Sequence, residues 1–349
     1  YSQIFYFRTM NILRKLLFPF AILYGFITSI RNFLYDHSFF ISYSFPIPII
    51  AVGNLSVGGT GKTPQIEYLI RLLSNDYKVA VLSRGYKRKS EGFVLANENS
   101  SAELLGDEPY QIHQKFPNIQ VAVDADRKNG IEQLLNLEHK PDIILLDDAF
   151  QHRRVKAGFY ILLTAFDDLF CNDFLLPTGN LRESRNGAKR ADLIVVTKCP
   201  GTISEQKMQN VKKKLNTNKN VFFSTIAYDD FVYNENESLT ISEINSKNKL
   251  LLAGIAKPEF FFNYLKLPND EVLSFPDHHD FSESDIEKIK SIAKSNRIIT
   301  TEKDFVRLIG KLPHNEIYYL PIKSKFIANG EDFDAIINRF LKEFKPTIL

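Results

Sequence analysis

The sequence predicts an α/β fold in which a mostly parallel β-sheet is flanked by helices on both faces. From residue 47 onward, apolar runs of strand length alternate with segments of helical pattern. The runs are apolar throughout, as in strands buried on both faces, whereas a strand with one solvated face would alternate. Parallel strands need helical crossovers between them, which fits the alternation. The runs read "IPIIAVGN", "KVAVLSR", "IQVAVD", "DIILLDD", "FYILLTAF" and "DLIVVTK".

Length and charge narrow the class of protein. The 349 residues are enough for two domains with a buried core. The 44 basic and 41 acidic residues give a net charge of +3, and no basic run is interleaved with aromatic residues, so we expect no nucleic-acid partner. Cys171 and Cys199 are the only cysteines. They favour a reducing cytosol over a disulfide framework or a cysteine zinc site.

Residues 1–45 differ from the rest of the chain. Residues 16–30, "LLFPFAILYGFITSI", carry no charge, and basic residues flank them on both sides. A spanning helix needs roughly 20 apolar residues, so we predict a helix inserted in or lying on a membrane, its basic flank on the cytosolic side. A buried core helix and a signal peptide are the alternatives, although no small-residue cleavage site follows. Met10 is a candidate initiator in place of Tyr1.

A polar, Asn/Ser-rich stretch divides the remainder into two α/β domains. It spans about residues 229–250, so we expect a first domain at 46–228 and a smaller one at 229–349. The second contains the strand-like runs "LLLAGIA", "EVLSF", "RIITTEKD" and "EIYYLPI". Near the end of the chain, apolar residues recur at helical spacing, which predicts a helix facing a core.

The loop after the first predicted strand has the features of a phosphate-binding loop. It ends in Gly61-Lys62-Thr63, although Ser56 stands where the strict pattern has glycine. A strand precedes it and a helix follows, so its backbone N–H groups can surround phosphate oxygens at a helix N-terminus. This predicts a P-loop NTPase-type fold in which Lys62 reaches the β- and γ-phosphates and Thr63 binds Mg²⁺. The predicted ATP-binding residues are Ser56, Val57, Gly58, Gly59, Thr60, Gly61, Lys62 and Thr63.

An acidic pair at another strand end completes the predicted metal site. In "DIILLDDAFQH", Asp147 and Asp148 follow an apolar strand. Such a carboxylate holds Mg²⁺ directly or through water in P-loop enzymes. Two adjacent aspartates can also simply cap the next element, but the nearby phosphate loop favours the metal role. The predicted metal ligands are Thr63, Asp147 and Asp148.

The nucleotide is predicted to be ATP. GTPases recognise guanine with an N-K-x-D sequence after a strand, whereas residues 197–200 read "TKCP" and lack the aspartate. A GTPase-like switch or a metallochaperone would also call for Cys/His clusters and a soluble N-terminus, which the sequence does not offer. Another P-loop small-molecule kinase remains open, because the hydrophobic N-terminus argues against it only weakly.

Several spaced motifs together resemble one family, the tetraacyldisaccharide 4'-kinases, or lipid A 4'-kinases, of Gram-negative bacteria. The resemblance implies ATP-dependent phosphorylation of the 4'-hydroxyl of an acylated disaccharide 1-phosphate, giving lipid IVA. It implies a peripheral or single-helix enzyme on the cytoplasmic face of the inner membrane. A hydroxyl residue at the Ser56 position is itself this family's form of the loop. The motifs are "LLFPFAILYG", "VGNLSVGGTGKTP", "LSRGYKRKS", "GDEPY", "DADR", "LLDDAFQHR", "LPTGNLRE", "FPDHHDF" and "TTEKD".

The resemblance also implies a catalytic dyad. Asp107 of "GDEP" would accept the proton of the attacking hydroxyl, and His278 of "FPDHHDF" would pair with it across the cleft between the domains. A carboxylate alone is a weak base at neutral pH, and an adjacent imidazole can tune its charge and orientation. His279 is the rival, but the family's histidine directly follows the aspartate at Asp277, which selects His278.

Further roles carry over by resemblance. Arg127 of "DADRKNG" matches an active-site arginine, suited to bidentate binding of phosphate. Arg182 and Glu183 of "NLRE" are expected at the substrate or nucleotide end of the cleft. Gln151 and His152 are expected to orient the acidic pair or contact substrate. An ATP contact is expected from the "TEKD" residues Glu302, Lys303 and Asp304.

Overall fold

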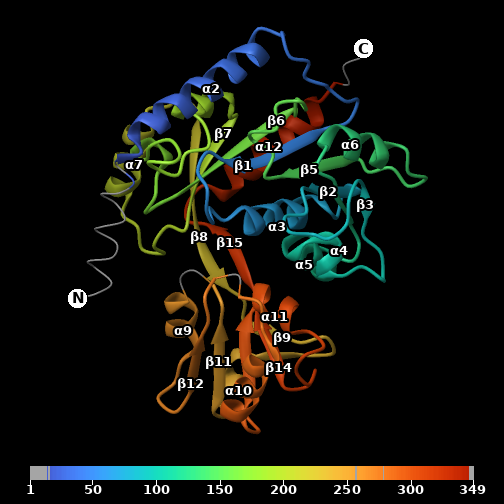
Figure 1. Ribbon diagram of the computed structural model, residues 1–349, viewed down its shortest axis with the longest axis vertical. Helices are drawn as coiled ribbons and strands as arrows, with labels where there is room; N and C mark the ends of the chain where they lie inside the picture. The colour runs from blue at the N-terminus through green and yellow to red at the C-terminus, as the bar shows by residue number, and fades with distance from the viewer. Residues whose placement is uncertain (1–13, 15, 256–257, 278, 346–349) are drawn as a thin grey trace.

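A computed structural model describes residues 14, 16–255, 258–277 and 279–345. Two sheets lie one above the other, with the larger at the top of Figure 1. The larger sheet has the order β15-β8-β7-β6-β1-β5-β2-β4-β3. Only its edge pairs, β15–β8 and β3–β4, are antiparallel, which confirms the predicted mostly parallel sheet. Its strands are β1 (Ile49–Asn54), β2 (Val79–Ser83), β3 (Val94–Leu95), β4 (Gln120–Val123), β5 (Ile143–Asp147), β6 (Phe159–Ala165), β7 (Leu193–Thr197), β8 (Asn220–Tyr228) and β15 (Ile322–Phe326).

Helices cover both faces of this sheet. Every residue of β1, β2, β5 and β7 is buried, because alternate side chains enter cores on opposite faces. One core contains side chains of α3, α5 and α12, and the other face is covered by α6, α7 and two 3₁₀ helices. These elements are α3 (Lys62–Leu73), α4 (Ala102–Leu105), α5 (Asp107–Lys115), α6 (Arg127–Leu135), α7 (Glu205–Leu215), α12 (Gly330–Glu343) and the 3₁₀ helices Phe170–Asn172 and Arg185–Arg190.

The smaller sheet forms the lower unit in Figure 1. Its order is β10-β9-β14-β13-β11-β12, and β11, β12, β13 and β14 are mutually parallel. Its strands are β9 (Phe231–Tyr233), β10 (Ser238–Thr240), β11 (Lys249–Ala253), β12 (Glu271–Ser274), β13 (Arg297–Thr301) and β14 (Ile317–Leu320). Its helices are α8 (Ile241–Asn245), α9 (Glu259–Leu265), α10 (Glu283–Ala293) and α11 (Glu302–Leu308).

The end of the chain differs from the expected division at 229–349. Strand β15 pairs with β8, from Ile322 opposite Tyr228 to Phe326 opposite Ser224, and so belongs to the larger sheet. Helix α12 buries its apolar side in the core of the first domain, which confirms a core-facing helix but in a different core. An amphipathic pattern shows which side of a helix needs cover but not which sheet supplies it. We therefore propose that the second domain ends near residue 321.

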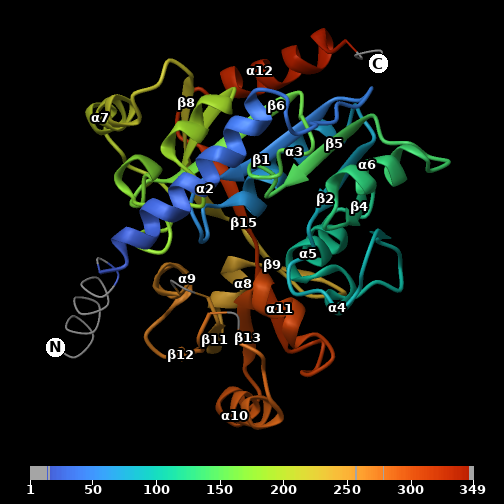
Figure 2. The ribbon, with the colours of Figure 1, turned by 45° about the horizontal axis from the view of Figure 1, so that its top comes forward.

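Helix α2 (Phe18–Asp36) lies along the outside of the first domain, as both ribbon views show (Figures 1 and 2). Its buried residues are Ala21, Gly25 and Thr28. A Cβ atom at Gly25 would come within 2.6 Å of Leu175, so glycine permits this close approach. Within the part of the chain that the structure describes, no helix combines the length and apolarity needed to cross a membrane.

Candidate active site

The predicted phosphate loop joins β1 to α3. Helix α3 begins at Lys62, and Gly61 before it has a φ of 82°. Gly58 has a φ of 111°. Both values lie in the left-handed region that favours glycine, so these positions explain part of the motif. The strand, loop and helix therefore follow one another as the sequence predicts, and the backbone N–H groups at the start of α3 are placed for an anion.

The loop is held from behind by residues of neighbouring strands. Asn54 Nδ2 donates to Thr60 Oγ1 at 2.8 Å, and Thr197 Oγ1 donates to the Thr60 carbonyl at 2.7 Å. Lys198 Nζ donates to the Gly59 carbonyl at 2.6 Å. Thr60 and the buried Ser56 thus belong to the framework of the loop. Thr197 and Lys198 of "TKCP" support the loop, a role that the sequence analysis missed.

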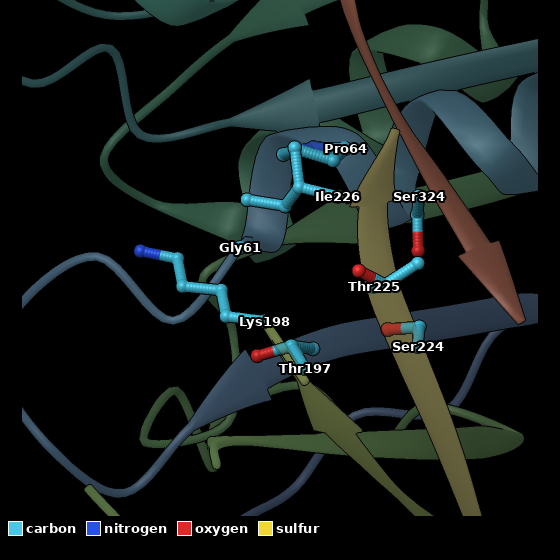
Figure 3. Close-up of a pocket in the computed structure, with 8 residues that line it drawn as sticks. All are labelled: Gly61, Pro64, Thr197, Lys198, Ser224, Thr225, Ile226 and Ser324. Atoms are coloured by element: carbon cyan, nitrogen blue, oxygen red, sulfur yellow. The ribbon is translucent and has the colours of Figure 1, made fainter. Parts of the chain in front are cut away.

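A small pocket borders this support (Figure 3). Lys198 and Thr197 reach it from the end of β7, and three consecutive residues of β8 form its opposite side. Hydroxyl groups of both strands line it beside the start of α3. The lining residues are Gly61, Pro64, Thr197, Lys198, Ser224, Thr225, Ile226 and Ser324.

The two aspartates at the end of β5 differ in environment. Asp147 is buried, and its Oδ2 accepts a hydrogen bond from Ser83 at 3.1 Å. Among the described residues its Oδ1 has no hydrogen-bond partner. Burial, and next the charge of Glu108, raises the pKa of Asp147 to about 7. A cation bound at Oδ1 would stabilise the ionised form of this buried carboxylate.

Asp148 takes part in an ionic group with the loop lysine. Its carboxylate accepts hydrogen bonds from Arg182 at 3.1 and 3.2 Å and lies 3.7 Å from Lys62 Nζ. Burial acts to raise the pKa of Asp148, but Lys62 and then Arg182 outweigh it and lower that pKa. Asp148 also has a φ of 48°, a strained backbone for a residue with a side chain. Such strain is frequent at functional sites.

Arg127 lies behind the acidic pair. It is only 2% exposed and donates to the backbone carbonyls of Asp124 at 2.6 Å and Asp147 at 3.0 Å. Burial lowers the pKa of Arg127 to about 10, although Asp147 and Asp148 act to raise it. Its positive charge therefore lies at the end of β5 and fixes the turn that carries both aspartates.

The "NLRE" pair points in two directions. Arg182 faces the glycine-rich loop, where it donates to Asn54 Oδ1 at 2.7 Å and to the Ser56 carbonyl, in addition to Asp148. Glu183 is buried and accepts hydrogen bonds from Arg190 at 2.7 Å and from Asn32 of α2 at 2.9 Å. Glu183 therefore anchors α2 to the first domain, while Arg182 reaches the glycine-rich loop.

Gln151 contacts the same helix, α2, and His152 follows it in the chain. Gln151 Nε2 donates to the Asn54 carbonyl at 2.8 Å and to Glu183 at 3.0 Å. Arg31 of α2 donates to the Gln151 carbonyl at 2.5 Å. Burial, and next the charge of Arg127, lowers the pKa of the half-buried His152 to about 4. The contacts of Gln151 place it between α2 and the loop.

Asp107 is the first residue of α5 and lies on the side of the second domain. Its Oδ2 accepts two hydrogen bonds from Arg307 of α11, at 3.1 Å from Nε and 2.5 Å from Nη2. His278, the predicted dyad partner, lies outside the described residues. Its rival His279 bonds Asp285 at 2.9 Å. Nothing in the local sequence indicated Arg307, which is 200 positions from Asp107.

The three "TEKD" residues make contacts within and between the domains. Glu302 lies 2.6 Å from Lys115 Nζ of α5. Asp304 Oδ2 accepts hydrogen bonds from the Gly254 backbone N–H at 2.7 Å and from a threonine hydroxyl at the start of α11. Lys303 Nζ lies 3.7 Å from Asp277. Each residue thus has its own protein partner in this arrangement.

Comparison with known proteins supplies the identity. A family model described as tetraacyldisaccharide-1-P 4'-kinase matches residues 13–342. The chain belongs to this kinase family. A tetraacyldisaccharide 4'-kinase of Flavobacterium psychrophilum is 66% identical over 337 residues, covering 95% of this chain and 98% of the relative. One of Bacteroides thetaiotaomicron is 45% identical, covering 95% and 94%.

A solved structure of the kinase LpxK extends the likeness to the fold. The "apo" form from Aquifex aeolicus, crystallised in complex with ATP, has a TM-score of 0.79 and 33% identity. The likeness covers 94% of this chain and 99% of that one. The family resemblance and the predicted fold class are therefore confirmed, and the chain is an ATP-dependent kinase.

In this kinase, some of the predicted site residues lie close together. Lys62, Asp148 and Arg182 form one ionic group, with Asp147 and Arg127 directly behind it. Other predicted residues lie elsewhere: Asp107 contacts α11, Glu183 contacts α2, and Glu302 contacts α5.

Proposed function

We propose that this kinase transfers the γ-phosphate of ATP to the 4'-hydroxyl of tetraacyldisaccharide 1-phosphate, a step of lipid A biosynthesis that gives lipid IVA. The single observation that carries the proposal is the ionic group of Lys62, Asp148 and Arg182 beside a glycine-rich loop, in a chain of this family. Phosphoryl transfer needs positioning and charge neutralisation more than covalent chemistry. Two cations and a carboxylate at the N-terminus of α3 are suited to that task.

We propose Thr63, Asp147 and Asp148 as the residues that hold Mg²⁺. The buried Oδ1 of Asp147, without a hydrogen-bond partner in the described part of the chain, fits this role. The described residues contain no group of three or more His, Cys, Asp or Glu side chains suited to a metal. Mg²⁺ commonly needs only one or two carboxylates, with phosphate oxygens and water as its other ligands. When bound, the ion would neutralise charge on the phosphate oxygens.

We assign the remaining roles by position. Lys62 would neutralise the β- and γ-phosphates, and Arg182 would bind phosphate oxygens once they compete with Asp148. Arg127 would hold the acidic turn and add positive charge behind it. Asp107 would accept the proton of the 4'-hydroxyl through Oδ1, because Arg307 binds its Oδ2. His278 is proposed as the partner of Asp107. ATP contacts by Glu302, Lys303 and Asp304 remain a proposal.

We propose that α2 holds the enzyme on the cytoplasmic face of the inner membrane. Its outward side consists of large apolar residues, which bind the interface between headgroups and acyl chains. Tyr24 of α2 donates to the Arg182 carbonyl at 2.7 Å, so the lipid-facing helix connects directly to the nucleotide site. An acylated substrate could thus stay in the lipid while its sugar reaches the site. The apolar residues on this side, 43–63% exposed, are Phe18, Phe20, Ile22, Leu23, Phe26, Ile27, Ile30 and Phe33.

The test is transfer of radiolabelled γ-phosphate from ATP to tetraacyldisaccharide 1-phosphate in mixed micelles. We expect a labelled lipid from the wild type and about 100-fold less from Asp107→Asn, since a positioned base contributes roughly that much. Glu103→Gln, at an exposed carboxylate nearby, should match the wild type. Absence of lipid product despite ATP binding, with label passing instead to a water-soluble sugar, would favour a small-molecule kinase.

A further inference from the structure

A buried ionic group lies apart from the phosphate loop, where α3, α5 and α11 meet. Lys115 Nζ is 2.7 Å from Glu67 Oε2 and 2.6 Å from Glu302 Oε1. The side chains of Glu67 and Glu302 are only 2% and 6% exposed. Gln111 donates to the other oxygen of Glu67, and the backbone N–H of Ile322 donates to Glu302. Charges this buried persist only when paired and hydrogen-bonded. Arg71 of α3 also donates to Glu67 Oε2, at 2.8 Å, so the particular role of Lys115 is to join Glu67 to Glu302.

The opposite end of α5 is held by the same second-domain helix. Asp107 and Lys115 are the first and last residues of α5, and Glu302 and Arg307 both belong to α11. Arg307 bonds Asp107 while Glu302 pairs with Lys115. Both ribbon views show α11 directly beneath α5 (Figures 1 and 2). Helix α11 therefore forms ion pairs with both the first and the last residue of α5.

The group also reaches the phosphate loop through α3. Helix α3 starts at Lys62 of the loop and carries Glu67. A rigid helix transmits the position of one of its residues to the others. The α3–α5 contact at Lys115 thus relates the position of Asp107 to that of the loop lysine.

We propose that Lys115 is a positioning residue for the kinase reaction, which fixes α5, and with it Asp107, relative to the phosphate loop. We call the contacts of Lys115 with Glu67 and Glu302, together with the Asp107–Arg307 pair, the α5 clamp. The inference rests on the proposed function of Asp107 as proton acceptor. A displacement of about 1 Å at a reacting group can cost about 100-fold in rate. If α5 were held at one end only, Asp107 could move by such a distance and the rate would fall.

The clamp also accounts for part of the "TEKD" motif. Glu302 has no need of a nucleotide to satisfy its charge, because Lys115 and the Ile322 N–H bind its two oxygens. Its position at the start of α11 also favours negative charge. In the clamp, Glu302 acts on the reaction through α5.

The experiment compares Lys115→Met, Lys115→Arg and the double variant K115M/E302Q with the wild-type full chain. K115M removes the charge but keeps a similar volume, whereas K115R keeps the charge. K115M removes the cation bound to Glu302, whereas Glu67 keeps its ion pair with Arg71 at 2.8 Å. K115M/E302Q also removes the charge of Glu302, and it serves if K115M alone folds poorly. The matched control is Lys89→Met, because Lys89 pairs with Glu103 at 2.8 Å with both side chains about 70% exposed.

Three quantities are measured for each variant. They are kcat with tetraacyldisaccharide 1-phosphate, KM for ATP, and hydrogen–deuterium exchange of the α5 amides. We expect K115M to lower kcat by 10- to 100-fold, to change KM for ATP less than threefold, and to speed exchange in α5. K115R should recover at least half of the lost kcat on a logarithmic scale, whereas K115M/E302Q, which lacks the Lys115–Glu302 pair, should stay at least about fivefold below the wild type. K89M should behave as the wild type.

A folded K115M, or K115M/E302Q in its place, with kcat within twofold of the wild type and unchanged α5 exchange would overturn the inference. So would an equal loss in K115R, because the clamp requires the charge. A failure of the proposed function looks different: the wild type itself gives no labelled lipid. Exchange in α5 then still tests the clamp, since it needs no lipid substrate.

Discussion

Helices α2 and α12 are both amphipathic, yet they use their apolar sides in opposite ways. Helix α12 places Phe333, Ile337 and Leu341 in the core of the first domain. Helix α2 turns Phe20 and Phe26 outward, at 61% and 63% exposed, and binds the protein through polar groups. The contrast shows that the polar contacts of a helix, as well as its apolar ones, decide which side faces the protein.

Truncation in α12 should have the largest effect. Phe333 is fully buried, and its ring lies 4.5 Å from that of Phe326 and 5.5 Å from that of Phe222. We expect Phe333→Ala to lower the free energy of unfolding by about 3–5 kcal/mol through lost burial and the cavity left behind. Phe26→Ala on α2 should change it by no more than about 0.5 kcal/mol. Urea unfolding in detergent measures both, and equal losses would remove the distinction between the helices.

A second experiment tests whether the exposed apolar residues of α2 bind lipid. We expect the triple variant Phe20→Ser, Phe26→Ser and Ile27→Ser to bind vesicles of phosphatidylethanolamine and phosphatidylglycerol about 100-fold more weakly. Partial burial of three apolar side chains in lipid gives about 3 kcal/mol, at roughly 1 kcal/mol each. Sedimentation with the vesicles gives the partition coefficient. Leu104→Ser, at an exposed apolar residue of α4, is the control, and a similar loss in that variant would argue against α2 as the lipid contact.

The two helices also show how far the sequence predicts this fold. The apolar strands and the amphipathic pattern of α12 are local features, so the parallel sheet and a core-facing helix followed from them. The sheet that receives α12 did not, because β15 joins β8 only after the chain has built a second domain. The pairing of strands so far apart in the sequence depends on tertiary packing, which a local sequence pattern cannot predict.

The same reasoning separates the parts of the site. The glycine-rich loop and the Asp147–Asp148 pair each consist of consecutive residues, so a local pattern suffices to find them, and their roles stay predictions. Arg307 with Asp107, and Glu302 with Lys115, are 200 and 187 positions apart, so their pairing appeared only in the fold. Motif resemblance drew attention to Glu302 without indicating its partner.

A smaller effect is expected at the hydrogen bond between Asn32 of α2 and Glu183. Asn32→Ala removes one of the donors to the buried Glu183, so we expect about 1–2 kcal/mol less free energy of unfolding. We also expect a several-fold lower kcat with lipid, because Glu183 adjoins Arg182. Ser29→Ala, at an exposed position of α2, is the control. If both substitutions behave alike in urea unfolding and in the kinase assay, the hydrogen bond to Glu183 does not anchor the helix.

The smallest effect concerns pH. The folded-state pKa of His152, about 4, is below its usual value near 6.5, so between these values the unfolded state binds more protons. The free energy of unfolding should therefore fall as pH drops through this window, by less than about 1 kcal/mol per pH unit, because solvent screens this half-buried group. His152→Asn should flatten the dependence measured by urea unfolding from pH 7.5 to 4.5. His37→Asn, at an exposed histidine just after α2, should leave it unchanged. Equal slopes in wild type and His152→Asn would show that another group causes the pH dependence.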